Sequence, residues 1–304
     1  MRERVAAIDC GTNSIRLLIT DLSDDRQSDV LREMRIVRLG QDVDSTGHLD
    51  EAAIDRTMAA TQEYGELIST FGVGRIRFCA TSAVRDADNG DAFADRVESV
   101  LGVRPDVLTG EDEAAASFLG ATRGLGPGRT VVVDIGGGST EIVVGDGETI
   151  ESAVSLDVGS VRLTERFLAS DPPTIDEITT CISYLDGVLG APASVPVPRF
   201  VGVAGTVTTV AAHVLALPSY DSEAIHGSRL HTDDVRAACL SLVQMTVADR
   251  RALPFMHPGR ADVIGAGALI LDRLIENLRL DTDELIVSES DILDGIAWSL
   301  RNAP

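Results

Sequence analysis

Residues 131–145 read VVVDIGGGSTEIVVG, and residues 5–19 read VAAIDCGTNSIRLLI. Both stretches follow one pattern: an apolar run, an aspartate, a glycine two positions later, a serine three positions after that, and a second apolar run. Because the apolar runs are rich in valine and isoleucine, each stretch is expected to form a strand, a tight loop and a returning strand. Two such hairpins, far apart in the chain, predict an internal duplication.

The sequence around each hairpin predicts an α/β domain. Residues 30–40 are typical of a third strand, residues 49–72 have apolar side chains at helical spacing, and further strands and helices alternate after them. Three strands followed by alternating helices and strands resemble a ribonuclease-H-like unit. The glycine- and proline-rich segment 124–130 precedes the second hairpin and indicates a boundary. We therefore expect duplicated ribonuclease-H-like domains, residues 1–125 and residues 126–304, with a cleft between them.

The composition excludes several classes of protein. Of the 304 residues, 44% are hydrophobic and 24% are charged, so the chain can bury a core. The formal net charge of −22 argues against binding to nucleic acid or to an anionic membrane. The chain contains no lysine, which excludes Schiff-base chemistry and a phosphate-loop lysine. Four cysteines without metal-binding spacing, and no long apolar run, predict a reduced cytoplasmic protein.

Three turns containing glycine follow predicted strands: DCGTNS (9–14), DIGGGS (134–139) and GVAGT (202–206). Glycine at such a turn lets backbone N–H groups approach an anion without a Cβ in the way, which is how a phosphate nest forms. A simple hairpin turn that needs a positive φ would explain one of these loops equally well. Three consecutive glycines before a serine, with a related turn upstream, favour phosphate binding.

Two aspartates, Asp9 and Asp134, end the strands before the first two turns, and Glu141 follows the second turn. Carboxylates in these places could bind Mg²⁺, which prefers oxygen ligands and keeps several waters. The alternatives are that each aspartate accepts hydrogen bonds from its own loop and that Glu141 is an outward-facing strand residue.

An acidic cluster and an arginine are further candidates. Glu111, Asp112 and Glu113 begin a predicted helix, where interaction with the helix dipole explains acidic residues without any function. Their position before the domain boundary keeps open a role at the predicted cleft. Arg85 follows a predicted strand and could bind phosphate as a planar fork. A surface ion pair with Asp86 or Asp88 is the alternative for Arg85.

With these motifs in family order, the sequence resembles the exopolyphosphatase and guanosine-pentaphosphate phosphohydrolase family (Ppx/GppA), in its short two-domain actinobacterial type. The resemblance is carried by DCGTNSIRLLI, ATSAVR, TGEDEA, VVVDIGGGSTEIV, GVAGT and HPGRADVIGAG. It implies the fold of the superfamily of actin, sugar kinases and heat-shock chaperones. It also implies a homodimer that hydrolyses a phosphoanhydride with Mg²⁺, or with Mn²⁺.

The resemblance also implies residue roles. Glu113 matches the catalytic glutamate, and the metal site would comprise Asp9, Asp134 and Glu141. Phosphate binding is expected of Thr12, Asn13, Ser14, Arg85, Gly136, Gly137, Gly138, Ser139, Gly205 and Thr206. Two departures from the family pattern are Asp112, where a glutamate is usual, and Ala204, where a serine is usual. The second departure removes a hydroxyl from the third phosphate loop.

The expected function is therefore release of terminal orthophosphate from inorganic polyphosphate by in-line attack of water. The alternative with the same chemistry is a phosphohydrolase acting on guanosine pentaphosphate, or on another nucleoside triphosphate. A third hypothesis, from a different class, is a non-catalytic sensor of polyphosphate or nucleotide, against which the retention of Glu113 and DIGGGS argues. A kinase is disfavoured because the chain has no inserted segment that would recognise an acceptor.

Overall fold

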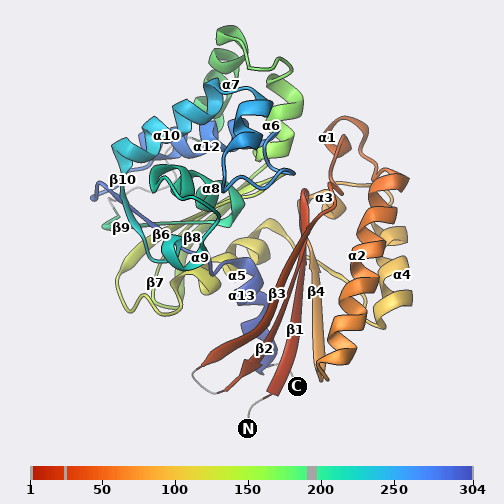
Figure 1. The fold of residues 1–304 in the computed structure, drawn as a ribbon. Helices are drawn as coiled ribbons and strands as arrows, with labels where there is room; N and C mark the ends of the chain where they lie inside the picture. Colours follow the sequence, from red (N-terminus) through yellow and green to blue (C-terminus); the bar gives the residue numbers. More distant parts are fainter. Residues whose placement is uncertain (1–2, 24–25, 190–196, 303–304) are drawn as a thin grey trace. The chain divides into compact units, whose positions relative to one another are not determined.

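The computed structural model describes residues 3–23, 26–189 and 197–302 (Figure 1). The chain divides into two compact units. Unit 1 comprises the chain up to Gly120 together with the segment from Ile292 onward, and unit 2 comprises Ala121–Asp291. The first boundary lies close to the expected one at residue 125, but the C-terminal segment groups with unit 1 and not with the second domain, to which the sequence interpretation assigned it.

Unit 1 is built on a five-stranded sheet in the order β3-β2-β1-β4-β5. The antiparallel pairs β1–β2 and β2–β3 form the expected hairpin and third strand, and β4 and β5 run parallel to β1. The strands are β1 (Glu3–Cys10), β2 (Ser14–Leu22), β3 (Gln27–Ile36), β4 (Arg75–Ala80) and β5 (Asp106–Val107).

Helices of unit 1 cover both faces of this sheet, so the central strand β1 is a nearly continuous apolar run. Ile8 and its neighbours on one face pack with Tyr64 of α2 and Phe93 of α4, while Ala7 on the other face packs with Leu293 of α13. The helices are α1 (Val43–Thr46), α2 (Glu51–Thr70), α3 (Ser82–Arg85), α4 (Gly90–Leu101), α5 (Gly110–Thr122) and α13 (Ile292–Ser299), followed by the 3₁₀ turn Leu300–Asn302.

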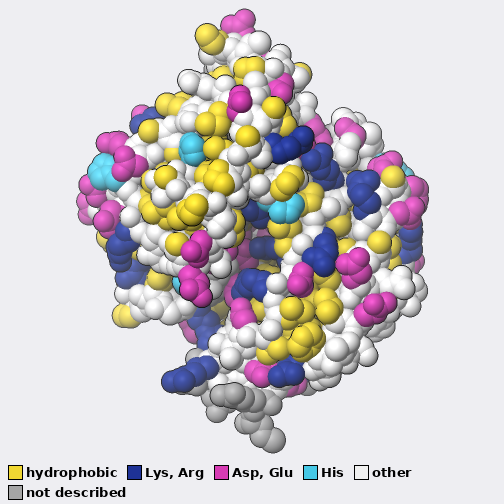
Figure 2. Space-filling model, viewed as in Figure 1, with side chains coloured by type: hydrophobic (Ala, Val, Ile, Leu, Met, Phe, Trp, Pro, Cys, Tyr) yellow, Lys and Arg dark blue, Asp and Glu magenta, His cyan; other side chains and the backbone are white. Residues whose placement is uncertain are grey.

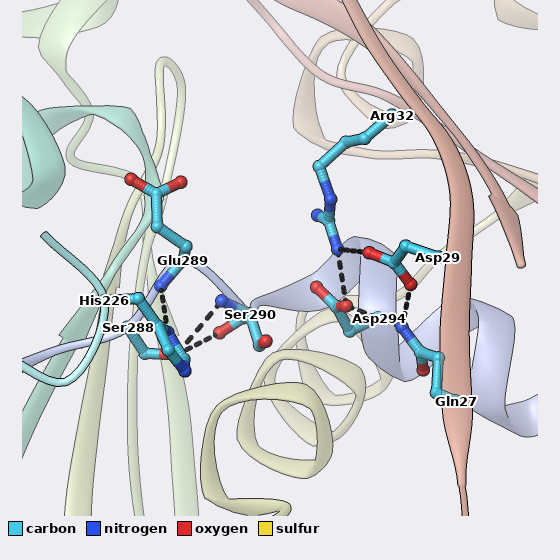
Figure 3. Close-up of polar contacts among 8 residues, drawn as sticks. All are labelled: Gln27, Asp29, Arg32, His226, Ser288, Glu289, Ser290 and Asp294. Atoms are coloured by element: carbon cyan, nitrogen blue, oxygen red, sulfur yellow. Dashed lines mark hydrogen bonds and ion pairs between the residues drawn. The ribbon is translucent and has the colours of Figure 1, made fainter. Parts of the chain in front are cut away.

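Polar contacts explain why α13 belongs to unit 1 (Figure 3). The buried carboxylate of Asp294 accepts hydrogen bonds from Gln27 Nε2 at 2.8 Å and from Arg32 at 2.6 Å, and both donors lie on β3. Trp298 completes the attachment by packing with Val5. These partners are separated from α13 by most of the sequence, which is why local sequence patterns did not reveal the pairing.

Unit 2 repeats the topology of unit 1. Its sheet has the order β10-β11-β9-β6-β7-β8, and reading β8-β7-β6-β9-β11 reproduces the pairing directions of β3-β2-β1-β4-β5. The expected duplicated ribonuclease-H-like fold is therefore confirmed, with β10 as an extra antiparallel edge strand. The strands are β6 (Arg129–Ile135), β7 (Thr140–Asp146), β8 (Thr149–Leu156), β9 (Arg199–Val203), β10 (Arg229–His231) and β11 (Glu284–Val287).

The core of unit 2 centres on α12, whose residues from Ile264 to Leu271 are all buried. A helix that is apolar on every side must be surrounded by other elements, here by β6 and four helices. The helices of unit 2 are α6 (Ser160–Phe167), α7 (Ile175–Val188), α8 (Ala204–Val214), α9 (Ser222–Ile225), α10 (Thr232–Gln244), α11 (Val247–Ala252) and α12 (Ile264–Asn277).

Surface and thiol properties follow from this packing. On the face drawn in Figure 2, the basic side chains, all of them arginine, are interspersed among acidic ones. All four cysteines are buried and free of disulfides. Within the described parts of the chain, none of the helices has the length and apolar character needed to span a membrane.

Candidate active site

The two hairpin loops have the same backbone geometry. In unit 1, the N–H of Gly11 donates to the carbonyl oxygen of Ser14 at 2.9 Å, and in unit 2 the N–H of Gly136 donates to that of Ser139 at 3.0 Å. Each loop therefore closes with the same hydrogen bond between the two residues that the sequence pattern shares. Both loops lie at the carboxyl end of a central strand, the edge at which α/β sheets bind ligands.

The loop of unit 2 turns its carbonyl groups toward helix α6. Gly136 O accepts from the N–H of Ser160 at 3.0 Å, and Gly137 O accepts from the N–H of Val161 at 2.9 Å. Because the C=O and N–H of a trans peptide point in opposite directions, the N–H groups of Gly137 and Gly138 face away from α6. Successive N–H groups aimed to one side form a nest suited to phosphate.

The loop of unit 1 is held in the same way by the segment that follows β3. Thr12 O accepts from the N–H of Gly40 at 2.8 Å, and Asn13 O accepts from the N–H groups of Val37 and Arg38 at 3.0 and 2.9 Å. The N–H of Asn13 and that of the next residue consequently point away from this segment. The duplicated sequence motif thus forms two loops that close with the same hydrogen bond and have their carbonyl groups bound by a neighbouring segment.

The acidic cluster at the start of α5 separates into two kinds of residue. Glu111 and Asp112 are exposed, whereas Glu113 is 7% exposed. Asp112 is part of a capping arrangement: its backbone N–H donates to Thr109 Oγ1 at 3.1 Å, and its carboxylate accepts from the same hydroxyl at 2.6 Å. Helix capping therefore accounts for Asp112 but not for the burial of Glu113.

Arg85 contacts Glu113. Its guanidinium lies 3.1 Å from Glu113 Oε2 and donates to the carbonyl of Leu108 at 2.9 Å. Of the surface partners weighed from the sequence, Asp86 is 3.9 Å from Arg85 Nε, and Asp88 pairs with a histidine. A guanidinium beside a buried carboxylate favours its ionised form, which is the form that accepts a proton.

A buried hydroxyl pair connects this arginine to the first loop. Thr12 Oγ1 lies 2.9 Å from Ser82 Oγ, and Ser82 begins the short helix that ends at Arg85. Within unit 1, the structure therefore links the phosphate-binding candidate Thr12 to the Arg85–Glu113 pair through one buried contact. The sequence interpretation did not include Ser82 among the site residues.

The strand-end aspartates have different partners in the two units. Asp9 on β1 is the cross-strand partner of Arg16 on β2, and two guanidinium nitrogens of Arg16 lie 2.6 and 3.0 Å from Asp9 Oδ2. Asp134 is paired on β7 with Glu141, so two buried carboxylates are direct cross-strand partners. Ser155 donates to Glu141 Oε1 at 2.7 Å. Like charges in such a pair repel each other unless a cation is bound or one of them is protonated.

This pair of carboxylates fits a divalent cation with oxygen ligands. No group of three or more His, Cys, Asp or Glu side chains gathers for metal binding among the residues that the structure describes. Asp134 and Glu141 would thus supply only part of a coordination shell. A divalent cation bound there would complete its coordination shell with waters and substrate oxygens.

The third predicted turn forms the first turn of α8, and it combines a strained residue with an arginine. Ala204 has φ of 67°, a left-handed conformation that is costly for a residue with a side chain. The guanidinium of Arg260 covers Gly205 so closely that a Cβ there would lie 2.5 Å from its central carbon. Arg260 also reaches the hydroxyl of Thr209 at 3.5 Å, while Thr206 is buried. Arg260 therefore places a cation beside this turn, which lacks the serine hydroxyl usual in the family because residue 204 is alanine.

Comparisons with known proteins decide the family. The model of the Ppx/GppA phosphatase family matches residues 18–302. The chain belongs to the Ppx/GppA phosphatase family. Exopolyphosphatase 2 of Mycobacterium tuberculosis is 49% identical over an alignment of 315 positions that covers 98% of each protein.

Two crystal structures of Ppx/GppA-type proteins share the fold. The Aquifex aeolicus Ppx/GppA family member is 35% identical with a TM-score of 0.84 over 100% of both chains. An exopolyphosphatase from Cytophaga hutchinsonii is 26% identical with a TM-score of 0.91, over 98% of this chain and 97% of that one. The resemblance inferred from the sequence motifs is thereby confirmed.

Two arginines of this Ppx/GppA protein escaped the sequence interpretation as site residues. Arg16 lies seven positions after Asp9, and only the register of the β1–β2 hairpin makes them partners. Arg260 lies within the HPGRADVIGAG motif, which was considered only for its glycines. The fold brings its guanidinium to Gly205. The sequence did contain an indication of a role for Arg260. The chain has no lysine, so arginines supply its side-chain cations other than histidine, and this arginine lies inside a family motif.

Proposed function

We propose that the chain is an exopolyphosphatase that releases terminal orthophosphate from inorganic polyphosphate. The observation that carries the proposal is the pair of backbone nests, one in each unit, together with a buried glutamate beside an arginine. A substrate made only of phosphate groups is matched by repeated N–H cradles and needs no aromatic or apolar pocket.

Glu113 is proposed as the group that orients the attacking water and accepts its proton. Transfer of a phosphoryl group requires an in-line nucleophile, positioning and neutralisation of charge. The guanidinium of Arg85 lies 3.1 Å from Glu113 Oε2, so it orients this buried carboxylate, and a positive charge at that distance favours the ionised form of a carboxyl group. A general base in this role typically contributes about 10²–10⁴-fold in rate.

The loops are proposed to position the phosphate groups. Unit 1 contributes Thr12, Asn13 and Ser14, and unit 2 contributes the expected loop residues from Gly136 to Ser139 together with Gly205 and Thr206. Arg85 is proposed to bind phosphate as well, through the guanidinium N–H groups that do not contact Glu113. The net charge of −22 repels a polyanion at long range, so binding must depend on these local donors.

Mg²⁺ is proposed as the metal, with Mn²⁺ as a substitute. Asp134 and Glu141 would hold it through carboxylate oxygens, and the bound cation would neutralise charge on the phosphate oxygens of the substrate. Asp9 was included in the predicted metal site. Because Arg16 already pairs with Asp9 Oδ2, a metal ion there would share this carboxylate with a guanidinium.

The test is phosphate release from long-chain polyphosphate, tripolyphosphate, guanosine pentaphosphate and ATP under one set of conditions. The proposal expects long-chain polyphosphate to give the highest kcat/KM, and a preference for guanosine pentaphosphate would replace it with the alternative substrate. Release from none of them, with phosphate still bound, would support the non-catalytic sensor. Full turnover after exhaustive chelation with EDTA would contradict the metal. The homodimer and the cytoplasmic location stay predictions.

A further inference from the structure

The loop of unit 2 is held by three successive carbonyl contacts, of which two are independent of side chains. Backbone N–H groups at the start of α6 bind Gly136 O and Gly137 O, and any residue except proline could provide them. The carbonyl of Gly138 is bound differently. It accepts a hydrogen bond from Nε of the Arg162 side chain at 2.8 Å.

Arg162 contacts the loop through both its backbone and its side chain. Its N–H lies 3.2 Å from Gly137 O while its guanidinium binds Gly138 O. The Gly138 carbonyl and the Ser139 N–H belong to one planar peptide, so fixing the carbonyl toward Arg162 fixes the N–H in the opposite direction. That is the direction in which the N–H groups of Gly137 and Gly138 already point.

We propose that Arg162 is a positioning residue that aims the Ser139 N–H at the bound phosphate. The third donor of the nest then depends on the identity of one side chain, whereas the first two follow from the backbone alone. A lysine at position 162 would have no N–H group equivalent to arginine Nε, so it would replace the bond to Gly138 O poorly. This inference rests on the proposed function for its kinetic test, but its structural test does not require hydrolysis.

The experiment compares Arg162→Met with a matched control, Arg166→Met. Both arginines lie on α6 one turn apart, both substitutions remove one positive charge, and methionine preserves helix propensity. Arg166 donates a hydrogen bond to the hydroxyl of Tyr184 and lies over its ring. Two readouts are used: kcat and KM with polyphosphate, and the amide NMR shifts of Gly137, Gly138 and Ser139 during titration with inorganic phosphate.

The inference expects Arg162→Met to lose the phosphate-induced shift of the Ser139 amide and to lower kcat by about 10²-fold, the usual effect of losing one preorganised donor. Arg166→Met should match the wild type in both readouts. Arg162→Lys should fall between them, and it replaces Arg162→Met if circular dichroism shows that the latter does not fold.

The outcomes separate the inference from the proposed function. If wild type hydrolyses polyphosphate but Arg162→Met keeps the Ser139 shift and a kcat within threefold of Arg166→Met, the inference is overturned and the function stands. If wild type does not hydrolyse polyphosphate but its Ser139 amide responds to phosphate only when Arg162 is present, the function fails and the inference stands. An Arg162→Lys protein equal to wild type in both readouts also overturns the inference.

Discussion

Adding one methyl group at Gly159 should lower turnover by about a hundredfold without unfolding the protein. Gly159 precedes α6 and lies against the glycine loop, where a Cβ would lie 2.5 Å from the backbone nitrogen of Gly138 and closer still to the carbonyl of Gly137. Real Cβ atoms do not approach backbone atoms so closely, so the loop must move. The backbone of Gly159 is extended, with φ of −152°, so alanine adds no conformational strain of its own.

The size of the effect follows from this geometry. Restoring an ordinary contact of roughly 3.5 Å requires a loop displacement on the order of 1 Å. A displacement of that size in a positioning group costs about 10²-fold in rate, whereas overpacking costs about 1–3 kcal/mol of stability. Gly159→Ala should therefore remain folded at room temperature, with kcat/KM for polyphosphate lowered at least about a hundredfold.

The assay is phosphate release from polyphosphate, with urea unfolding as the measure of stability. Gly187→Ala is the matched control because Gly187 is exposed on α7 and its added Cβ would have no neighbour within 4 Å. That variant should be fully active and more stable by about 0.5–1 kcal/mol, since alanine is favoured over glycine in a helix. A folded Gly159→Ala protein with activity within a few-fold of the control would show that the loop does not position the reacting phosphate.

Three further predictions concern the site and the core. Glu113→Gln should lower kcat at least about a hundredfold while polyphosphate still binds. Glu111→Gln and Asp112→Asn should retain most activity. An inactive Asp112→Asn enzyme would refute the assignment of Glu113 as the base. Ala204→Gly should raise the free energy of unfolding by up to about 1 kcal/mol, measured in urea, because glycine tolerates the left-handed backbone. Burial raises the pKa of Cys79 to about 12, which leaves its thiol protonated below that pH, so a disulfide reagent at about pH 8 should label the cysteines only after unfolding.

The sequence predicted the elements that depend on local patterns. Both hairpins lie where the repeated motif placed them, and the third strand and first long helix lie within a few residues of their expected ranges, at Gln27–Ile36 and Glu51–Thr70. The reason is that alternation, helical spacing and turn glycines act over a few neighbouring residues. Successive side chains on a helix point about 100° apart, so Glu111, Asp112 and Glu113 were expected to face different directions. Of the three, only Glu113 is buried.

Features that depend on pairing between distant segments were missed. The attachment of α13 to unit 1 requires Asp294 to meet Arg32, and no local pattern in either segment indicates the other. The partners of Asp9 and Gly205 were overlooked for the same reason, since strand register and tertiary packing bring Arg16 and Arg260 to them. Motifs located the candidate site, whereas the charge balance within it required the three-dimensional structure.

That charge balance shows how the two copies have diverged. The residue seven positions after the strand-end aspartate is Arg16 in the first copy and Glu141 in the second, and in both copies it is the direct cross-strand partner of that aspartate. The first pair therefore joins a carboxylate to a guanidinium, and the second joins two buried carboxyl groups. Cross-strand partners lie about 5 Å apart at Cβ, so two carboxylates there repel each other, and a nearby cation or protonation of one of them relieves the repulsion. One difference at an equivalent position thus gives the strand-end aspartate a guanidinium partner in one half of the duplicated fold and a carboxyl partner in the other, and the proposed metal site depends on that difference.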